Sequence, residues 1–197
     1  MLNKNITLNG TCVNMRTINE SHFTDIIRWR NDPEINQYLN QPYELTPELQ
    51  SKWYNETYLQ SSDLLFVMVE KSSGKSFGTL GFNDLDMDKR RAIAGRLLVG
   101  EKRYRRSPEL LEANLLFYDF LFEVLDLQYV YCHIVTENKS AIAFDTRLGF
   151  VPNVETVFPQ YCKVRDMSQI EMVNTKGTYY RCREKLVPIL KHYFESL

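Results

Sequence analysis

Apolar and polar positions along the 197-residue chain follow two periods, one typical of strands and one typical of helices. Strands rich in β-branched and aromatic residues are predicted at residues 11–18, 64–70, 77–85, 91–99, 127–135 and 167–173. Helices are predicted at residues 22–31, 46–60, 107–124, 139–148 and 178–194. This mixture of elements, without a linker or an internal repeat, predicts one α/β (α+β) domain over residues 1–197.

The connections between these elements predict how the strands pair. Short turns join the strands between residues 64 and 99, so these strands should form an antiparallel meander. A long helix separates the fourth strand (91–99) from the fifth (127–135), and such a crossover makes two strands parallel neighbours. The fold class expected is a mixed, mostly antiparallel central sheet with one parallel pair, flanked by helices.

Composition excludes several classes of function. The net charge of −1 disfavours nucleic-acid binding, which is typical of basic domains. The sequence has no stretch long enough to cross a membrane and no signal-peptide pattern, so we expect a cytoplasmic protein. The four cysteines form no Cys-x-x-Cys pair, which predicts reduced thiols and no metal site.

A basic cluster lies between the fourth strand and the long helix. It consists of Lys102, Arg103, Arg105 and Arg106, and Ser107-Pro108 follows as a helix start. A helix N-terminus carries unpaired N–H donors and roughly half a positive charge, and arginine adds forked donors. The pattern therefore predicts a site for a polyphosphate, although a solvated surface turn would have the same composition.

Several motifs together resemble a known family. They are Asn138-x-x-Ala141-Ile142, Leu148-Gly149-Phe150, the strand–turn–helix at 96–113, the segment Trp29–Ile35, and Thr46-Pro47-Glu48-Leu49-Gln50-x-x-Trp53. Over residues 12–175 the chain resembles the GNAT superfamily of acyl-CoA-dependent acyltransferases. It is similar in particular to the branch that holds ribosomal-protein N-terminal acetyltransferases and amino-sugar N-acetyltransferases of nucleotide-sugar pathways.

The resemblance implies that acetyl-CoA is the co-substrate and that the fourth and fifth strands splay apart to admit it. The turn before the long helix would hold the diphosphate, the fourth strand would pair with the pantetheine amides, and an Asn side chain would bind the same arm. The implied cofactor-binding residues are Leu98, Val99, Arg103, Arg105, Arg106, Ser107, Glu109, Leu110 and Asn138. The two glycines usual in this turn are absent, so its backbone must take another path or leave more room.

Three residues are candidates for proton transfer. Asp145 occupies the position where many members of the family place a tyrosine acid, and it can act as an acid only if its pKa is raised. His133, in the fifth strand, is either a packed strand histidine or a base near the acceptor amine. Asp84, at the end of the third strand, is either a turn residue or a group that holds or deprotonates the amine.

Trp29, Arg30, Asn31 and Asn83 are the candidate substrate-binding residues. Arginine followed by asparagine suits a sugar or a phosphate, although both can be ordinary residues at a helix end. The resemblance places Ile93 where ribosomal-protein enzymes commonly carry a glutamate on the fourth strand. That difference favours the amino-sugar branch.

These observations predict an N-acetyltransferase in which a primary amine attacks acetyl-CoA directly in a ternary complex. The favoured acceptor is a small molecule, an amino sugar on a nucleotide. A protein N-terminus is the alternative acceptor, and an acyl-CoA-binding module without catalysis is the alternative of another class. The aromatic final helix is a candidate surface for a homodimer.

Overall fold

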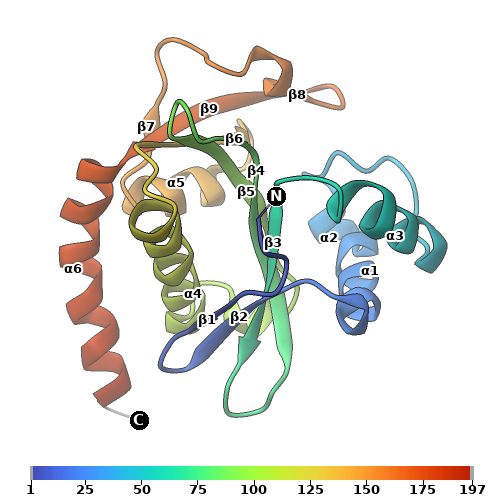
Figure 1. The fold of residues 1–197 in the computed structure, drawn as a ribbon, viewed down its shortest axis with the longest axis horizontal. Helices are drawn as coiled ribbons and strands as arrows, with labels where there is room; N and C mark the ends of the chain where they lie inside the picture. Colours follow the sequence, from blue (N-terminus) through green and yellow to red (C-terminus); the bar gives the residue numbers. More distant parts are fainter. Residues whose placement is uncertain (1, 196–197) are drawn as a thin grey trace.

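The computed structural model describes residues 2–195 as a central sheet with helices on both sides (Figure 1). The strands are β1 (Thr7–Asn9), β2 (Val13–Thr17), β3 (Leu64–Glu70), β4 (Ser76–Asp86), β5 (Arg91–Val99), β6 (Tyr129–Val135), β7 (Val151–Pro152), β8 (Lys163–Val164) and β9 (Met167–Thr175). The α-helices are α1 (Phe23–Asn31), α2 (Pro33–Asn36), α3 (Pro47–Trp53), α4 (Pro108–Asp119), α5 (Lys139–Arg147) and α6 (Lys176–Glu195). The π-helical turns η2 (Tyr54–Tyr58) and η4 (Phe120–Val124) extend α3 and α4, and the short 3-10 turns are η1 (Glu20–His22), η3 (Lys102–Tyr104) and η5 (Pro159–Tyr161).

The predicted elements are confirmed, whereas three short strands, the short helix α2 and the 3-10 turns η3 and η5 were not predicted. Strands β3 and β5 occupy the predicted residues, and the other long elements agree within a few residues at each end. No pattern in the sequence predicts β1, α2, β7 or β8, which have two to four residues each. Segments of that length are too short to show a period, and they form because neighbouring elements hold them.

One nine-stranded sheet, in the order β1-β2-β3-β4-β5-β6-β9-β7 with β8 on β9, runs through the described residues. The predicted parallel pair, β5 with β6, is present, whereas the other neighbouring strands are antiparallel. This pair is short, because only Arg91–Ile93 lie opposite Tyr129–Tyr131. Beyond these residues β5 pairs only with β4, and β6 pairs only with β9. The two central strands therefore part, as expected.

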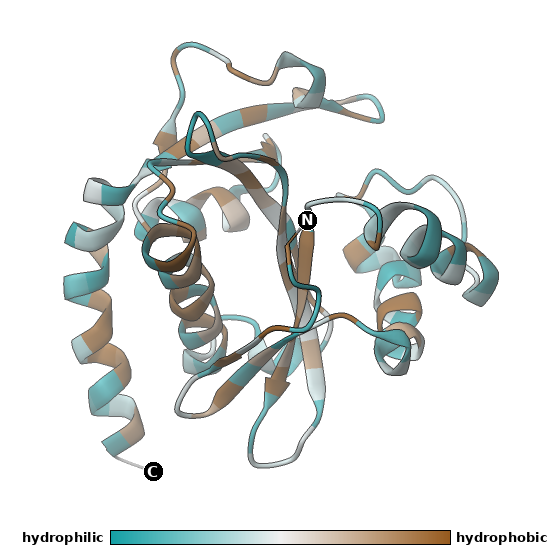
Figure 2. Ribbon diagram, viewed as in Figure 1, coloured by the Kyte–Doolittle hydropathy of each residue, from teal (hydrophilic) through white to brown (hydrophobic). Residues whose placement is uncertain are grey.

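Each face of the sheet has its own core. Helices α4, α5 and α6 lie on one side of the sheet and α1, α2 and α3 on the other (Figure 1). The larger core joins α4 to the central strands, and the hydrophobic colour concentrates there in Figure 2. The smaller core joins α1 and η2 to β3 and β5. None of the helices within residues 2–195 is both long and apolar enough to span a bilayer.

Glu112 ties the N-terminal hairpin to α4. Its carboxylate is only 6% exposed and accepts the backbone N–H groups of Thr11, Cys12 and Val13 at 2.5, 2.9 and 2.9 Å. Val13 is buried and Cys12 is half-buried, so the carboxylate replaces water as the acceptor for these N–H groups. The carboxylate therefore fixes the turn that leads from β1 into β2.

We predict that Glu112→Ala lowers the free energy of unfolding by about 2–4 kcal/mol, because three N–H groups lose their acceptor. Urea denaturation measures this difference. Glu184→Ala, an exposed glutamate of α6, is the matched control and should stay within about 0.5 kcal/mol of the wild type. Equal effects of the two substitutions would show that the Glu112 contacts contribute nothing.

Candidate active site

The gap between β5 and β6 is built by a bulge in β5. Thr79 lies opposite Leu98 and Gly81 opposite Gly95, so β5 carries one more residue than β4 between these pairs. Arg96, inside the bulge, has φ +56°, and the Thr79 hydroxyl donates to its carbonyl at 2.8 Å. The bulge turns the rest of β5 away from β6. It leaves Leu98 and Val99, both predicted cofactor contacts, paired on one side only.

The turn before α4 reaches its shape without glycine. Arg106 adopts the left-handed φ of +68° that glycine favours, and Ser107 caps the helix by accepting the Leu110 N–H at 3.2 Å. Within residues 2–195 the N–H groups of Arg106 and Glu109 make no hydrogen bond. Two donors at a helix N-terminus, beside an arginine, fit the diphosphate that the sequence predicts here.

The cationic side chains of the turn differ in their partners. Arg103 pairs with Glu70 at 3.2 Å and donates to the Tyr104 hydroxyl. Lys102 and Arg105 both reach Glu34, at 3.0 and 3.6 Å. Arg106 makes no ion pair with any described residue. Ion pairs at the surface contribute about 0–1 kcal/mol to stability, so Arg103 and Arg105 can exchange their glutamates for a phosphate. Arg106 can bind phosphate without breaking an ion pair.

Gly100, just before this turn, permits a close contact with Trp29. A Cβ on Gly100 would lie 2.2 Å from the indole ring, so only glycine fits there. Trp29 is 1% exposed and donates from Nε1 to Glu101 at 3.1 Å. The structure therefore gives Trp29 a packing role at the end of β5, whereas the sequence suggested contact with substrate.

We predict that Arg106→Ala raises the Kd for acetyl-CoA by about tenfold, because a charge-assisted contact to phosphate is lost. Arg103→Ala and Arg105→Ala should have smaller effects, since each of these side chains must break an ion pair with a glutamate before it can bind the phosphate. Isothermal titration calorimetry gives the three constants. Lys185→Ala, on the exposed side of α6, is the control, and a Kd for Arg106→Ala equal to that of the control would remove Arg106 from the site.

Asn138 lies just before α5, the helix that follows β6, and Asp145 lies within this helix. Asn138 caps the helix, as its Oδ1 accepts the Ala141 N–H at 3.2 Å, and its amide nitrogen has no partner among the described residues. Asn138 is thus the N-cap of α5, and its amide remains available for the predicted pantetheine contact. The Asp145 carboxyl is buried and accepts from the Cys132 thiol at 3.6 Å. Burial raises the pKa of Asp145 to about 7, which meets the condition stated for an acid.

This raised pKa makes stability depend on pH. An unfolded Asp ionises near pH 3.9, roughly three units below the folded group, so the wild type loses stability as the pH rises through this interval. Asn cannot ionise. We predict that the unfolding free energy of Asp145→Asn, relative to wild type, increases between pH 4 and pH 8 by up to roughly 4 kcal/mol. Urea titrations at both pH values measure it, and a constant difference would contradict the buried neutral carboxyl.

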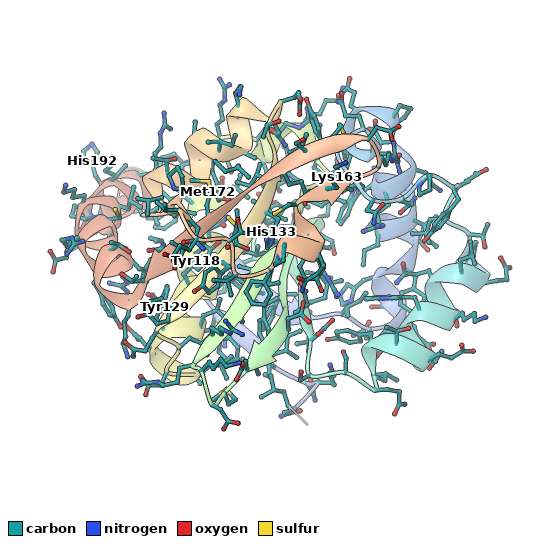
Figure 3. The ribbon with its side chains drawn as sticks, turned by 90° about the horizontal axis from the view of Figure 1, so that it is seen from above. Tyr118, Tyr129, His133, Lys163, Met172 and His192 are labelled. Carbon is teal, nitrogen blue, oxygen red and sulfur yellow. The ribbon has the colours of Figure 1, made fainter. Side chains whose placement is uncertain are left out.

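On the opposite face of the sheet lies a pocket of about 500 Å³. Arg30 of α1, Arg96 of β5 and Lys163 of β8 line it, and no Asp or Glu does so among the described residues. Arg96 pairs with Asp63 at 2.8 Å, whereas the Nε of Arg30 donates to the neutral Gln41 at 2.7 Å and to no other described residue. Burial lowers the pKa of Arg30, and the charge of Arg96 adds to that effect. In Figure 3 Lys163 lies at the β8 end of the β8–β9 hairpin, toward α1.

Two buried donors of the pocket have no acceptor in the part of the chain that the structure describes. The Nη1 atom of Arg96 and the Nε2 atom of Gln50 are buried without a hydrogen bond, and both residues line the pocket. Buried polar groups are nearly always hydrogen-bonded, so we expect a bound molecule to supply acceptor oxygens to these two atoms. The pocket is therefore suited to an anionic or oxygen-rich molecule.

The predicted substrate residues are only partly brought together. Arg30 lines the pocket, but Asn31 uses its amide to hold Leu45, donating at 2.9 Å and accepting at 2.8 Å, and so fixes the loop after α2. Asn83 donates to Asp84 at 2.6 Å, away from the pocket. Asp84 is exposed, has φ +51° and accepts from the Tyr161 hydroxyl at 2.6 Å.

His133 has a partner that the sequence did not reveal. Its Nε2 lies 2.9 Å from Oε2 of Glu171 on β9, and its ring packs 5.4 Å from that of Tyr161. Glu171, Arg96 and Lys163 were missed as site residues. Glu171 and Arg96 are charged residues inside strand patterns, a signal that could have been noted. Lys163 depends on a two-residue strand that no pattern shows.

Comparison with known proteins identifies the family. Residues 13–151 match the model described as "Acetyltransferase (GNAT) domain". The chain therefore belongs to the GNAT acetyltransferases, and it is an acetyl-CoA-dependent N-acyltransferase. No curated protein sequence matches the chain.

Solved structures share the fold at low identity. A GCN5-related N-acetyltransferase from Brucella melitensis has a TM-score of 0.79 at 19% identity, covering 95% of this chain and 86% of that one. FdhC, a nucleotide-linked sugar GNAT, has 0.74 at 17%, covering 94% and 99%. Spermidine N-acetyltransferase from Vibrio cholerae, solved with CoA and spermine, has 0.69 at 19%, covering 87% and 99%. These likenesses establish the fold, and they leave the acceptor to be argued from the site. No group of His, Cys, Asp and Glu side chains suited to a metal lies within residues 2–195.

Proposed function

We propose that the protein transfers an acetyl group from acetyl-CoA to the primary amine of an amino sugar carried on a nucleotide. The observation that supports this acceptor is the pocket of Arg30, Arg96 and Lys163, with two unpaired buried donors and no carboxylate among its described lining residues. The phosphates of a nucleotide supply the negative charge, and sugar hydroxyls supply acceptor oxygens. Among the structural neighbours, FdhC is a nucleotide-linked sugar GNAT.

The same pocket is a poor match for a polyamine. A polyamine carries several positive charges, and a site for it needs carboxylates, whereas within residues 2–195 the Arg30 side chain has only neutral Gln41 as its hydrogen-bond partner. Like charges brought together in a half-buried pocket repel each other. The spermidine N-acetyltransferase shares the fold, but the cationic lining of this pocket argues against a polyamine as the acceptor here.

In this proposal the two faces of the sheet divide the work. Arg106, the N–H groups at the start of α4 and the unpaired edge of β5 hold the co-substrate, and its thioester supplies the acetyl group. The pocket holds the acceptor on the opposite face, so that the amine approaches the carbonyl carbon through the gap. Alignment of two bound reactants can contribute roughly 7–11 kcal/mol to lowering the barrier. Asp145, neutral below its pKa of about 7, can protonate the departing thiolate.

A panel of acceptors tests the substrate class. With acetyl-CoA present, thiol release should be found with nucleotide-linked amino sugars and not with spermidine or with ribosomal-protein N-terminal peptides. Turnover of peptides, with none on the sugars, would overturn the proposal in favour of a protein acceptor.

We predict that Arg30→Ala raises KM for the nucleotide-linked sugar by at least about tenfold, because the acceptor loses a charged partner, and leaves KM for acetyl-CoA unchanged. Arg28→Ala is the matched control, since Arg28 lies on the same helix but is 57% exposed and pairs with Asp25 and Glu101. An equal KM for both variants would show that Arg30 does not meet the acceptor.

A further inference from the structure

Glu171 is a buried carboxylate that accepts hydrogen bonds from several groups of the described residues. It is 3% exposed and lies on β9 beside β6. Its Oε1 accepts from Asn153 and from the Val157 N–H at 2.6 and 2.8 Å, and its Oε2 accepts from the Phe158 N–H at 2.9 Å. Burial by itself would raise the pKa of Glu171, but these hydrogen bonds and the one from His133 hold that pKa below its usual value.

An ionised carboxylate fixes the tautomer of its neighbour. Nε2 of His133 lies 2.9 Å from Oε2 of Glu171, and a carboxylate can only accept, so Nε2 carries the hydrogen. Nδ1 is then the basic nitrogen. It is buried, and it has no hydrogen-bond partner within the described residues.

The position of His133 connects this nitrogen to the acceptor side of the sheet. The imidazole ring packs against Phe158 and Tyr161, and Tyr161 lines the pocket. In Figure 3 His133 lies near the middle of the molecule, beneath the β8–β9 hairpin. The face that carries His133 is the one opposite Cys132 and Asp145, because successive side chains of a strand alternate. Acid and base candidates thus stand on the two sides of β6.

We propose that Glu171 is a positioning residue, which holds His133 in the Nε2–H tautomer so that Nδ1 accepts the proton released by the attacking amine. The amine nitrogen forms a bond to the acetyl carbon, the carbon–sulfur bond breaks, and its electron pair leaves with the sulfur. The surplus proton on nitrogen passes to Nδ1 through one water molecule. The imidazolium that forms faces the charge of Glu171, in the arrangement of a carboxylate-oriented base.

The charged and titratable groups around His133 come from several elements. Glu171 faces it from β9, Asp84 acts on it from β4, and Tyr161 packs on it from η5. Arg91 of β5 stacks on Phe158 at 5.0 Å. Burial lowers the pKa of His133 against the opposing effects of Glu171 and Asp84, so the ring is neutral and able to accept a proton near pH 7.

The tautomer of His133 is measured in the absence of an acceptor substrate. Nitrogen-15 NMR of the three labelled histidines should show a neutral His133 protonated at Nε2 in the wild type. In Glu171→Gln the loss of negative charge should lower the pKa of His133 and leave the titration of His22 unchanged. A His133 protonated at Nδ1 in the wild type, or one that titrates identically in the variant, would overturn the proposal.

The pH profile of the reaction tests the catalytic part. His133→Asn should lower kcat by about 10²- to 10⁴-fold and remove the acid limb of the kcat/KM profile. Glu171→Gln should lower kcat and move this limb to lower pH in the wild-type background, and should cause no further loss in the His133→Asn background. Loss by the same factor in both backgrounds, with an unmoved limb, would make Glu171 purely structural.

Asn153→Ala separates the two roles of the carboxylate. It removes a tie between the 153–158 loop and Glu171 while keeping the contact to His133, so it should lower thermal stability and leave the acid limb in place. If the wild type turns over no nucleotide-linked sugar, the substrate proposal fails, and the NMR result still decides the role of Glu171.

Discussion

The parting of β5 from β6 after three paired residues is the constraint on which the rest of the structure depends. In a sheet, the backbone N–H and C=O groups of each strand are paired by the neighbouring strands. Two neighbouring strands therefore separate only where other interactions fix their paths. Here β4 holds β5 through the bulge at Arg96, and β9 pairs with β6 along its full length. The unpaired edges that remain are what an extended thioester arm can use.

The same parting distributes chemistry over two faces. On the side of α4 and α5, the helix N-terminus, Arg106 and the neutral carboxyl of Asp145 suit a phosphorylated donor and its thiolate. On the side of α1 and β8, the cationic pocket and the His133–Glu171 pair suit an anionic acceptor that must lose a proton. Arg96 connects the two faces of the sheet, because it lies in the bulge that opens the gap and its side chain lines the pocket.

The long elements, the parallel pair and the family were predictable from the sequence, because periodicity and motif spacing are local properties. Arg106 shows where local reasoning fails, since a non-glycine residue takes the left-handed conformation in this turn and no pattern in the sequence indicates it. Trp29 shows another limit, because its burial follows from contact with Gly100, about seventy positions later in the chain. The Glu171–His133 pair depends on the register of β6 against β9, and no spacing in the sequence encodes that register.

A crystal structure of the complex with acetyl-CoA tests the central claim most directly. The account predicts a diphosphate against the N–H groups of Arg106 and Glu109, and a thioester between Leu98 and β6, with the two strands still parted beyond Ile93. A diphosphate bound away from the start of α4, or β5 and β6 paired along their length, would contradict it.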